Sequence, residues 1–257
     1  MSTRRRDADA RLATIRALLA KAEATPFSEE AEAFTAKASE LMARFAIDEA
    51  MVWAHDSSDA RSAPEEIRIE IHRPFLAQKA VLVSEISTIL GCRSIRFIGR
   101  SGDPTETVSI VGFGPDLDLV ETLVTSLFLQ LTAAMTSGSA VGHTAAQVSA
   151  WRRSFIVGFG ESVCARLTAD RALAVAAERG RPNPSPGTGA GQTSSTELVL
   201  ADRGDAVESE FRRRHPRVRQ VRVGTGSSES GRRAGTTAGR RADLGSPRLR
   251  PQRALPR

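Results

Sequence analysis

The run from Arg11 to Ile47 predicts two amphipathic helices joined by a short turn. Its large apolar residues recur at intervals of three and four, which places them on one face of each helix. They are Leu12, Ile15, Leu18 and Leu19 in the first helix, and Phe34, Leu41, Met42 and Phe45 in the second. Pro26 ends the first helix because it cannot donate a backbone hydrogen bond. Isolated helices of this length are marginal in water, so both must pack on each other or on the rest of the chain.

The sequence of this run, IRALLAKAEATPFSEEAEAFTAKASELMARFAID, resembles a family of unknown function, DUF2786. The shared pattern is a basic and apolar helix, a short turn, a Glu-Ala-Glu-Ala opening and an ending of the Leu-Met-Ala-Arg type. The resemblance covers about the first fifth of the chain closely, and residues 151–155 and 239–245 are similar to the C-terminal half of some members. It implies an arrangement of the fold and brings no activity or catalytic residue with it.

Three short strands are predicted in the centre of the chain. Ile67, Ile69 and Ile71 alternate with polar residues, which is typical of a strand with one buried face. Residues 92–98 and 107–112 predict two more strands, and the Gly, Asp and Pro residues between them favour a hairpin loop. Such strands would form a small, mainly antiparallel sheet covered by helices on one face.

Long helices are predicted around this sheet. Helical spacing of apolar residues covers residues 75–90, 117–135 and 146–178. The glycine-rich turn at residues 112–116 delivers carboxylates into the helix that follows, which would repel a phosphate, so we interpret it as an ordinary helix start. Gly158 and Gly160 each cost about 0.5–1 kcal/mol relative to Ala inside a helix. This cost is explained if another backbone packs closely there or if the helix is kinked.

The C-terminal part of the chain is basic. Residues 181–257 hold 16 Lys and Arg against 7 Asp and Glu, a net charge of +9, whereas residues 1–180 have a net charge of −3. Residues 181–195 are rich in Pro, Gly, Ser and Thr, which predicts a linker. Among the arginines, glycine recurs at every fourth position: Gly231, Gly235 and Gly239. That spacing fits a small-residue helix pressed on a partner, but disorder is the favoured interpretation.

We therefore predict an α+β fold. A helical hairpin is expected at residues 1–54 and a linker at residues 55–64. A small three-stranded sheet packed against long helices is expected at residues 65–180. Residues 181–257 are expected to form a basic, low-complexity tail, rich in Pro, Gly and Arg and largely disordered.

The sequence lacks the motifs of familiar enzymes. Cys92 and Cys164 lie 72 positions apart, which is neither a zinc-binding spacing nor a disulfide framework. The histidines are His55, His72, His143 and His215. None has a Cys, His, Asp or Glu at the spacing of a metal site, and no P-loop or HExxH motif is present. No cofactor, resident metal or small-molecule substrate is therefore predicted.

The expected location is cytoplasmic. No run approaches the roughly 18 apolar residues that span a bilayer, so no membrane partner is expected. The basic N-terminus lacks the apolar region of a secretory signal.

The leading functional interpretation is a non-enzymatic accessory protein that associates with nucleic acid through its basic tail. The candidate nucleic-acid-binding residues are Arg212, Arg213, Arg214, Arg217, Arg219, Arg152 and Arg153. One alternative is a metal-dependent hydrolase or nuclease, in which Asp103, Glu106 and Asp116 hold a hard cation. A second alternative is a protein-interaction module with a protein partner. The interpretation based on the tail fails if the tail packs into the folded part with its guanidinium groups matched to carboxylates.

Overall fold

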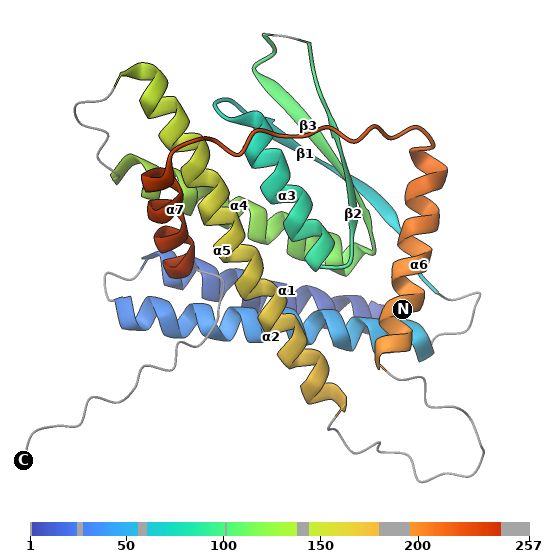
Figure 1. Ribbon diagram of the computed structural model, residues 1–257. Coiled ribbons are helices and arrows are strands. Elements are labelled where there is room, and N and C mark those ends of the chain that lie inside the picture. Colours follow the sequence, from blue (N-terminus) through green and yellow to red (C-terminus); the bar gives the residue numbers. More distant parts are fainter. Residues whose placement is uncertain are drawn as a thin grey trace, which may run out of the picture.

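The computed structural model describes residues 2–24, 28–55, 61–100, 102–137, 144–179 and 196–242 (Figure 1). The helices are α1 (Ser2–Ala24), α2 (Ser28–His55), α3 (Leu76–Ile89), α4 (Gly114–Ser137), α5 (Ala145–Arg179), α6 (Thr196–Arg214) and α7 (Glu229–Arg241). The strands are β1 (Glu65–His72), β2 (Arg93–Phe97) and β3 (Thr105–Gly112). The predicted α+β class is confirmed.

The three strands form one antiparallel sheet in the order β1-β3-β2, so that β3 is central and β2 forms one edge. In β3, Val108 and Ile110 point towards the main core, which α3 and α4 share. Ser109 and Val111 point to the opposite face, because neighbouring side chains of a strand alternate between faces. Val111 packs there against α6. Helices therefore cover both faces of the sheet, and not one face as predicted.

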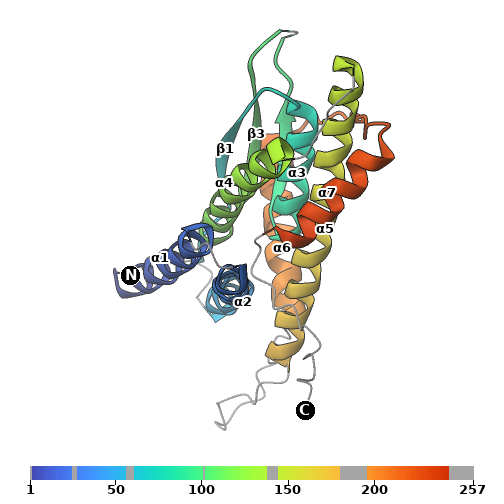
Figure 2. The ribbon, with the colours of Figure 1, turned by 90° about the vertical axis from the view of Figure 1, so that its left-hand side faces the viewer.

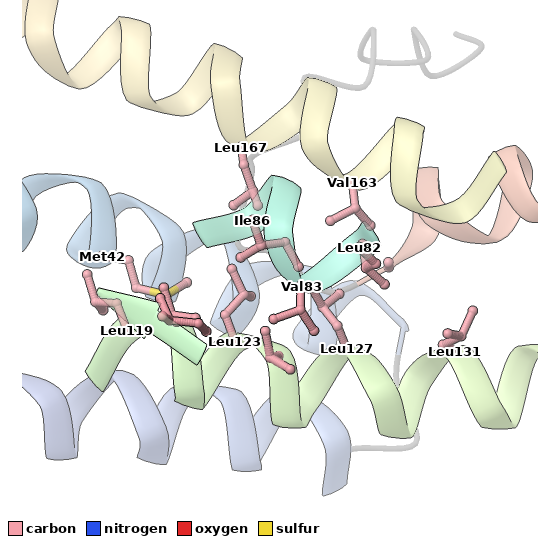
Figure 3. Packing of buried hydrophobic residues seen from close by; sticks show 14 of the residues in the cluster. Met42, Leu82, Val83, Ile86, Leu119, Leu123, Leu127, Leu131, Val163 and Leu167 are labelled. Carbon is pink, nitrogen blue, oxygen red and sulfur yellow. The ribbon is translucent and has the colours of Figure 1, made fainter. Parts of the chain in front are cut away.

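Helix α4 supplies the largest share of the main core, part of which is drawn in Figure 3. Its Leu119, Leu123, Leu127 and Leu131 are fully buried. Figure 3 shows these leucines facing α3, α5 and Met42 of α2. Burying each large apolar side chain stabilises the fold by roughly 1.5–3 kcal/mol. Among the described helices, α4 is the one whose length and composition would suffice to cross a membrane. The apolar composition of α4 is explained by these leucines, which form a buried stripe along the helix.

The predicted N-terminal hairpin is present. Helix α1 lies along α2 and also reaches α4 (Figure 2). The predicted apolar faces are buried at Leu12, Ile15 and Leu19 in α1, and at Met42 and Phe45 in α2. Helix α2 also contacts α5 and α6, so the hairpin shares one buried cluster with the rest of the chain.

The prediction of a largely disordered tail is wrong for residues 196–242, which form α6, α7 and the segment between them. Helix α6 buries Val199, Val207 and Phe211 on one side. These three apolar residues, spaced eight and four apart, anchor a helix that is otherwise densely charged. Residues 180–195, which include the whole linker predicted at residues 181–195, and residues 243–257 lie outside the described residues.

Helix α7 packs on α5 through backbone rather than through large side chains. Gly231, Gly235 and Gly239 are all buried against α5. They meet Trp151, Phe155 and Phe159 in order, so the two helices run in the same direction, as Figure 1 shows. A Cβ atom on any of these glycines would lie closer than 3.0 Å to a backbone carbonyl oxygen of α5. Gly158 of α5 faces the carbonyl oxygen of Arg232 in the same way, so of the two explanations offered for this glycine the close approach of a second backbone is the one that the structure supports.

Candidate functional site: a groove along the open edge of the sheet

A crossing segment, residues 215–228, joins α6 to α7 across the front of the molecule (Figure 1). At its start, the His215 amide donates to the Phe211 carbonyl oxygen at 2.8 Å. Near its end, Gln78 Nε2 of α3 donates to the Gly224 carbonyl oxygen at 2.9 Å, and the Ser228 amide donates to Ser154 Oγ of α5 at 3.0 Å. The crossing segment is thus fixed at both ends. Between these ends, no hydrogen bond to another described residue is recorded for residues 216–223.

A groove of about 680 Å³ lies between the crossing segment and the body of the protein. Helix α3, strand β2, helix α5 and the crossing segment all contribute to its walls. The lining residues are Ala80, Val81, Ser84, Glu85, Thr88, Ile89, Ser94, Ile95, Arg96, Ile98, Glu161, Cys164, Val218, Arg219, Val221 and Val223. The walls are mainly aliphatic, with a few charged groups.

The groove follows the open edge of β2. Three consecutive residues of this strand, Ser94, Ile95 and Arg96, line it. Since neighbouring side chains of a strand point to opposite faces, a groove lined by three in a row must run along the strand's backbone edge. The other edge of β2 pairs with β3, and no β3 residue lines the groove. Among the described residues, no segment forms backbone hydrogen bonds with the groove side of β2.

Exposed aliphatic side chains and exposed arginines share the rim of the groove. Ile98, Val218 and Val221 leave 56%, 51% and 55% of their surfaces exposed. Arg219 lines the groove, and Arg217 and Arg222 flank it in sequence. All three arginines are exposed, and none forms an ion pair with a described residue. The crossing segment contains no Asp or Glu, so its charge is uncompensated along its own length.

The cysteine in the groove is not an activated nucleophile. Cys164 Sγ lies 3.6 Å from Glu85 Oε2 of α3. Burial, followed by the nearby Glu85 carboxylate, raises the pKa of the Cys164 thiol to about 12. The thiolate is the reactive form, so this thiol is unreactive at neutral pH. The pKa of Cys92 is also raised by burial, and both cysteines are free thiols.

A polar cluster centred on Glu66 holds the start of the crossing segment against the sheet. Ser109 Oγ donates to Glu66 Oε1, and Arg214 Nη1 lies 3.1 Å from Glu66 Oε2. His215 Nε2 is 3.7 Å from Glu66 Oε1, and its ring packs against Phe97 and Phe211. Ser109 is fully buried, and its hydroxyl donates to the carboxylate instead of to the imidazole. The cluster therefore lacks the serine-to-base hydrogen bond of a nucleophilic site.

Glu66 gives the fold a predicted dependence on pH. The Ser109 hydroxyl, helped by Arg214 and His215, lowers the pKa of Glu66 from its usual 4.5. A carboxylate with a lowered pKa in the folded state stabilises the fold above its unfolded pKa, and this contribution is lost as the pH falls through the folded pKa. We expect Glu66→Gln to lower the free energy of unfolding at neutral pH, with a difference from the wild type that shrinks at about pH 3.

Urea unfolding of both proteins at the two pH values measures this difference. Glu70→Gln on the same strand is the matched control, because Glu70 is exposed and has no recorded ion pair among the described residues. The control should change stability by less than about 0.5 kcal/mol at either pH. An effect of Glu66→Gln that is equal at both pH values would contradict the assigned role of the carboxylate.

The carboxylates predicted to hold a metal are not brought together. Asp103 accepts a hydrogen bond from the Arg100 amide at 2.6 Å, and Glu106 binds Arg96 through both of its oxygens. Asp116 is buried in α4. Within the described part of the chain, no group of three or more His, Cys, Asp or Glu side chains is arranged to hold a metal ion. The hydrolase alternative thus receives no candidate metal site from the structure.

Asp116 instead forms a buried ion pair. Its Oδ2 lies 2.6 Å from Arg203 Nη2 of α6, and both side chains are buried. The Arg203 guanidinium also lies 4.0 Å from the centre of the Phe113 ring. Burial raises the pKa of Asp116, and Arg203 opposes that rise. This pair ties α6 to the first turn of α4, so its arrangement is structural.

Three of the seven arginines predicted to bind nucleic acid are engaged with carboxylates. Arg212 pairs with Glu208 at 2.7 Å and Arg213 with Glu210 at 2.6 Å. Arg214 pairs with both Glu210 and Glu66. These pairs lie near the surface and are individually weak, but they neutralise the densest part of the predicted basic run. Of the predicted residues in this region, Arg217 and Arg219 of the crossing segment are left exposed and without a recorded ion pair among the described residues.

The two other predicted arginines lie on α5. Arg152 is exposed, and Arg153 Nη1 donates to Ser149 Oγ at 3.0 Å. Trp151 packs against Phe155, with ring centres 5.1 Å apart, and against the main core. The indole is therefore partly buried and engaged in contacts within the protein.

The groove itself was not predicted. The signal that could have found it is the order Arg, Val, Arg, Gln, Val, Arg, Val at residues 217–223, which exposes valines beside arginines. The edge position of β2 requires the strand order, which the sequence leaves open.

Comparison with known proteins identifies one part of the chain. Residues 11–49 match the family described as Protein of unknown function (DUF2786), which confirms the resemblance of the N-terminal hairpin. The match ends within α2 and does not reach the groove, so the similarity proposed for the C-terminal half stays a prediction. No curated protein and no solved structure matches the chain.

Proposed function

We propose that this protein is a non-enzymatic protein-interaction module, which receives an extended segment of a partner protein as an additional strand beside β2. The observation that carries the proposal is the groove along the open edge of this strand. Strand addition uses main-chain hydrogen bonds for affinity and pockets for alternate side chains for specificity.

The dimensions and lining of the groove suit such a segment. β2 offers five residues, Arg93–Phe97, whose groove side has no recorded backbone partner among the described residues. A strand seated there would place alternate side chains towards the aliphatic wall formed by Val81, Val218 and Val221. An exposed edge strand with apolar neighbours is a template for pairing with another chain.

Nucleic acid remains the competing partner, and the structure supports it less. Single-stranded nucleic acid is held by a basic groove together with aromatic side chains on which bases stack. The described lining of the groove contains no aromatic residue. The arginines at positions 212–214 are paired with carboxylates, so beside the groove the arginines of the crossing segment are the ones left to neutralise phosphates. Protein binding is therefore the better-supported function.

Backbone pairing with β2 is tested with short peptides that alternate Val and Thr. Methylating alternate backbone nitrogens removes the hydrogen-bond donors along one edge of such a peptide and leaves its side chains unchanged. Two isomers exist, with either the odd or the even nitrogens methylated, and only one edge of the peptide can face β2. We expect one isomer to bind at least about tenfold more weakly than the parent, because each lost hydrogen bond is worth about 1 kcal/mol.

The measurement is a titration of the full chain followed by the amide chemical shifts of residues 93–97. Ile98→Asp should abolish binding, because Ile98 lines the groove. Leu173→Asp is the matched control, since Leu173 is 69% exposed on α5 and does not line the groove. If both methylated isomers bind as well as the parent, or if the parent shifts no amide of β2, strand addition is excluded.

A further inference from the structure

We infer that the segment received beside β2 is acidic, with Asp or Glu side chains directed at Arg217, Arg219 and Arg222 of the crossing segment. This inference rests on the proposed function and names the chemistry of its partner. Two observations carry it: the three arginines have no recorded ion pair among the described residues, and one of them lines the groove.

The spacing of the arginines places two further positive charges close to Arg219. Arg217 and Arg222 lie two and three residues from Arg219, which corresponds to about 7 and 10 Å along an extended chain. Charges within about 8–10 Å act on one another at physiological ionic strength. A carboxylate close to Arg219 is therefore stabilised by Arg219 directly. The positive electrostatic potential of Arg217 and Arg222 stabilises it further.

The carboxylates of the groove lie on its other walls. Glu161 of α5 already pairs with Arg232 of α7. Glu85 of α3 approaches the Cys164 thiol, which carries no positive charge. A bound acidic side chain is thus favoured on the side of the crossing segment and disfavoured near α3. This asymmetry predicts a preferred orientation of the partner strand in the groove.

The same charges argue against a second copy of this chain as the occupant. Pairing β2 with β2 across a two-fold axis centred on Ile95 would place Arg93 opposite Phe97, and Arg96 opposite Ser94. It would also bring two crossing segments together, each with three unpaired arginines and no acidic residue. Like charges at such an interface are destabilising, whereas an acidic partner neutralises them.

The test compares labelled peptides that alternate Val with Glu or Val with Thr, titrated into the full chain and followed by fluorescence anisotropy. We expect the Glu peptide to bind about tenfold more tightly at physiological salt and the advantage to disappear near 1 M salt, where the screening length is about 3 Å. The triple variant Arg217→Gln, Arg219→Gln, Arg222→Gln should remove the advantage. Glu85→Gln should slightly increase the affinity advantage of the Glu peptide over the Thr peptide.

A second triple variant, Arg152→Gln, Arg240→Gln, Arg241→Gln, removes the same charge from exposed arginines that do not line the groove. It should keep the preference for the Glu peptide. Equal affinities of the wild type for the two peptides would overturn the inference and leave strand addition intact. The inference would also be overturned if the preference for the Glu peptide persisted at 1 M salt, or if both triple variants lost this preference equally. Unlabelled oligothymidine and unlabelled Glu peptide are then compared as competitors of the labelled Glu peptide. If oligothymidine displaces it at the lower concentration, phosphate is the recognised anion and the inference is overturned.

Discussion

Alanine at Gly235 should lower the stability of the fold, whereas alanine at Gly204 should raise it. The Cβ atom added at Gly235 would overlap the Phe155 carbonyl oxygen of α5, and the rigid backbone on both sides cannot yield as a flexible side chain would. Overpacking of this kind costs typically 1–3 kcal/mol, and separating α7 from α5 would also expose the surfaces that the two helices bury. We expect a melting temperature lower by several degrees.

Gly204 is the matched control because it is exposed inside α6 and its added Cβ would meet nothing within 4 Å. Alanine there should stabilise the helix by about 0.5–1 kcal/mol. Thermal unfolding followed by circular dichroism measures both variants. Limited trypsin digestion gives an independent reading, since an undocked α7 can unfold locally and trypsin then cleaves after its arginines, Arg232, Arg233, Arg240 and Arg241. Equal melting temperatures for Gly235→Ala and the wild type would show that the close helix contact does not stabilise the protein.

Arg203→Met should cost about 3–5 kcal/mol of the free energy of unfolding, the range found when one partner of a buried ion pair is removed. The substitution leaves the Asp116 carboxylate buried without a counter-charge and removes the guanidinium from the Phe113 ring. Burial raises the pKa of Asp116, so the carboxyl of the variant can become neutral by binding a proton. The loss of stability should therefore be largest at neutral pH and should shrink as the pH falls.

The double variant Arg203→Met, Asp116→Leu tests whether the lost stability comes from the unpaired charge. Replacing both members of a buried pair by apolar residues is often neutral or stabilising, so the double variant should recover most of the loss. Urea unfolding of the two single variants and the double variant completes the thermodynamic cycle. If the effects of the single substitutions simply add in the double variant, Asp116 and Arg203 do not act as a pair.

Periodicity predicted the elements whose stability comes from large apolar side chains. The stripes of the N-terminal hairpin at Leu12, Ile15 and Phe45 are buried as expected. The alternation at Ile67 and Ile71 marks a real strand, β1. In these elements the named apolar residues face the core, so the spacing of these residues in the sequence indicates the orientation of the element.

The same reasoning missed the folded part of the predicted tail. Helix α7 has no large apolar residue, and what it buries is glycine backbone at Gly231, Gly235 and Gly239. A glycine stripe carries no apolar periodicity, and glycine inside a helix ordinarily indicates instability. The clue lay in the other helix, where Gly158 suggested the close approach of a second backbone.

The candidate site depended on contacts that only the folded chain displays. The basic run at positions 212–214 is conspicuous in the sequence, but Glu208, Glu210 and Glu66 neutralise it. Glu66 lies 148 residues before Arg214, so no local sequence pattern predicts this ion pair. The groove likewise joins α3, β2, α5 and the crossing segment, which only the tertiary fold brings together.

The docking of α7 on α5 also sets an order of events during synthesis. Partners across this contact, such as Glu161 with Arg232 and Arg166 with Ala242, lie 71 and 76 residues apart in the chain. At roughly 5–20 residues per second, α5 leaves the ribosome several seconds before α7 follows it. During that interval the glycine-bearing face of α5 stays uncovered. A nascent chain interrupted before Glu229 would keep this face exposed and offer it to chaperones and proteases.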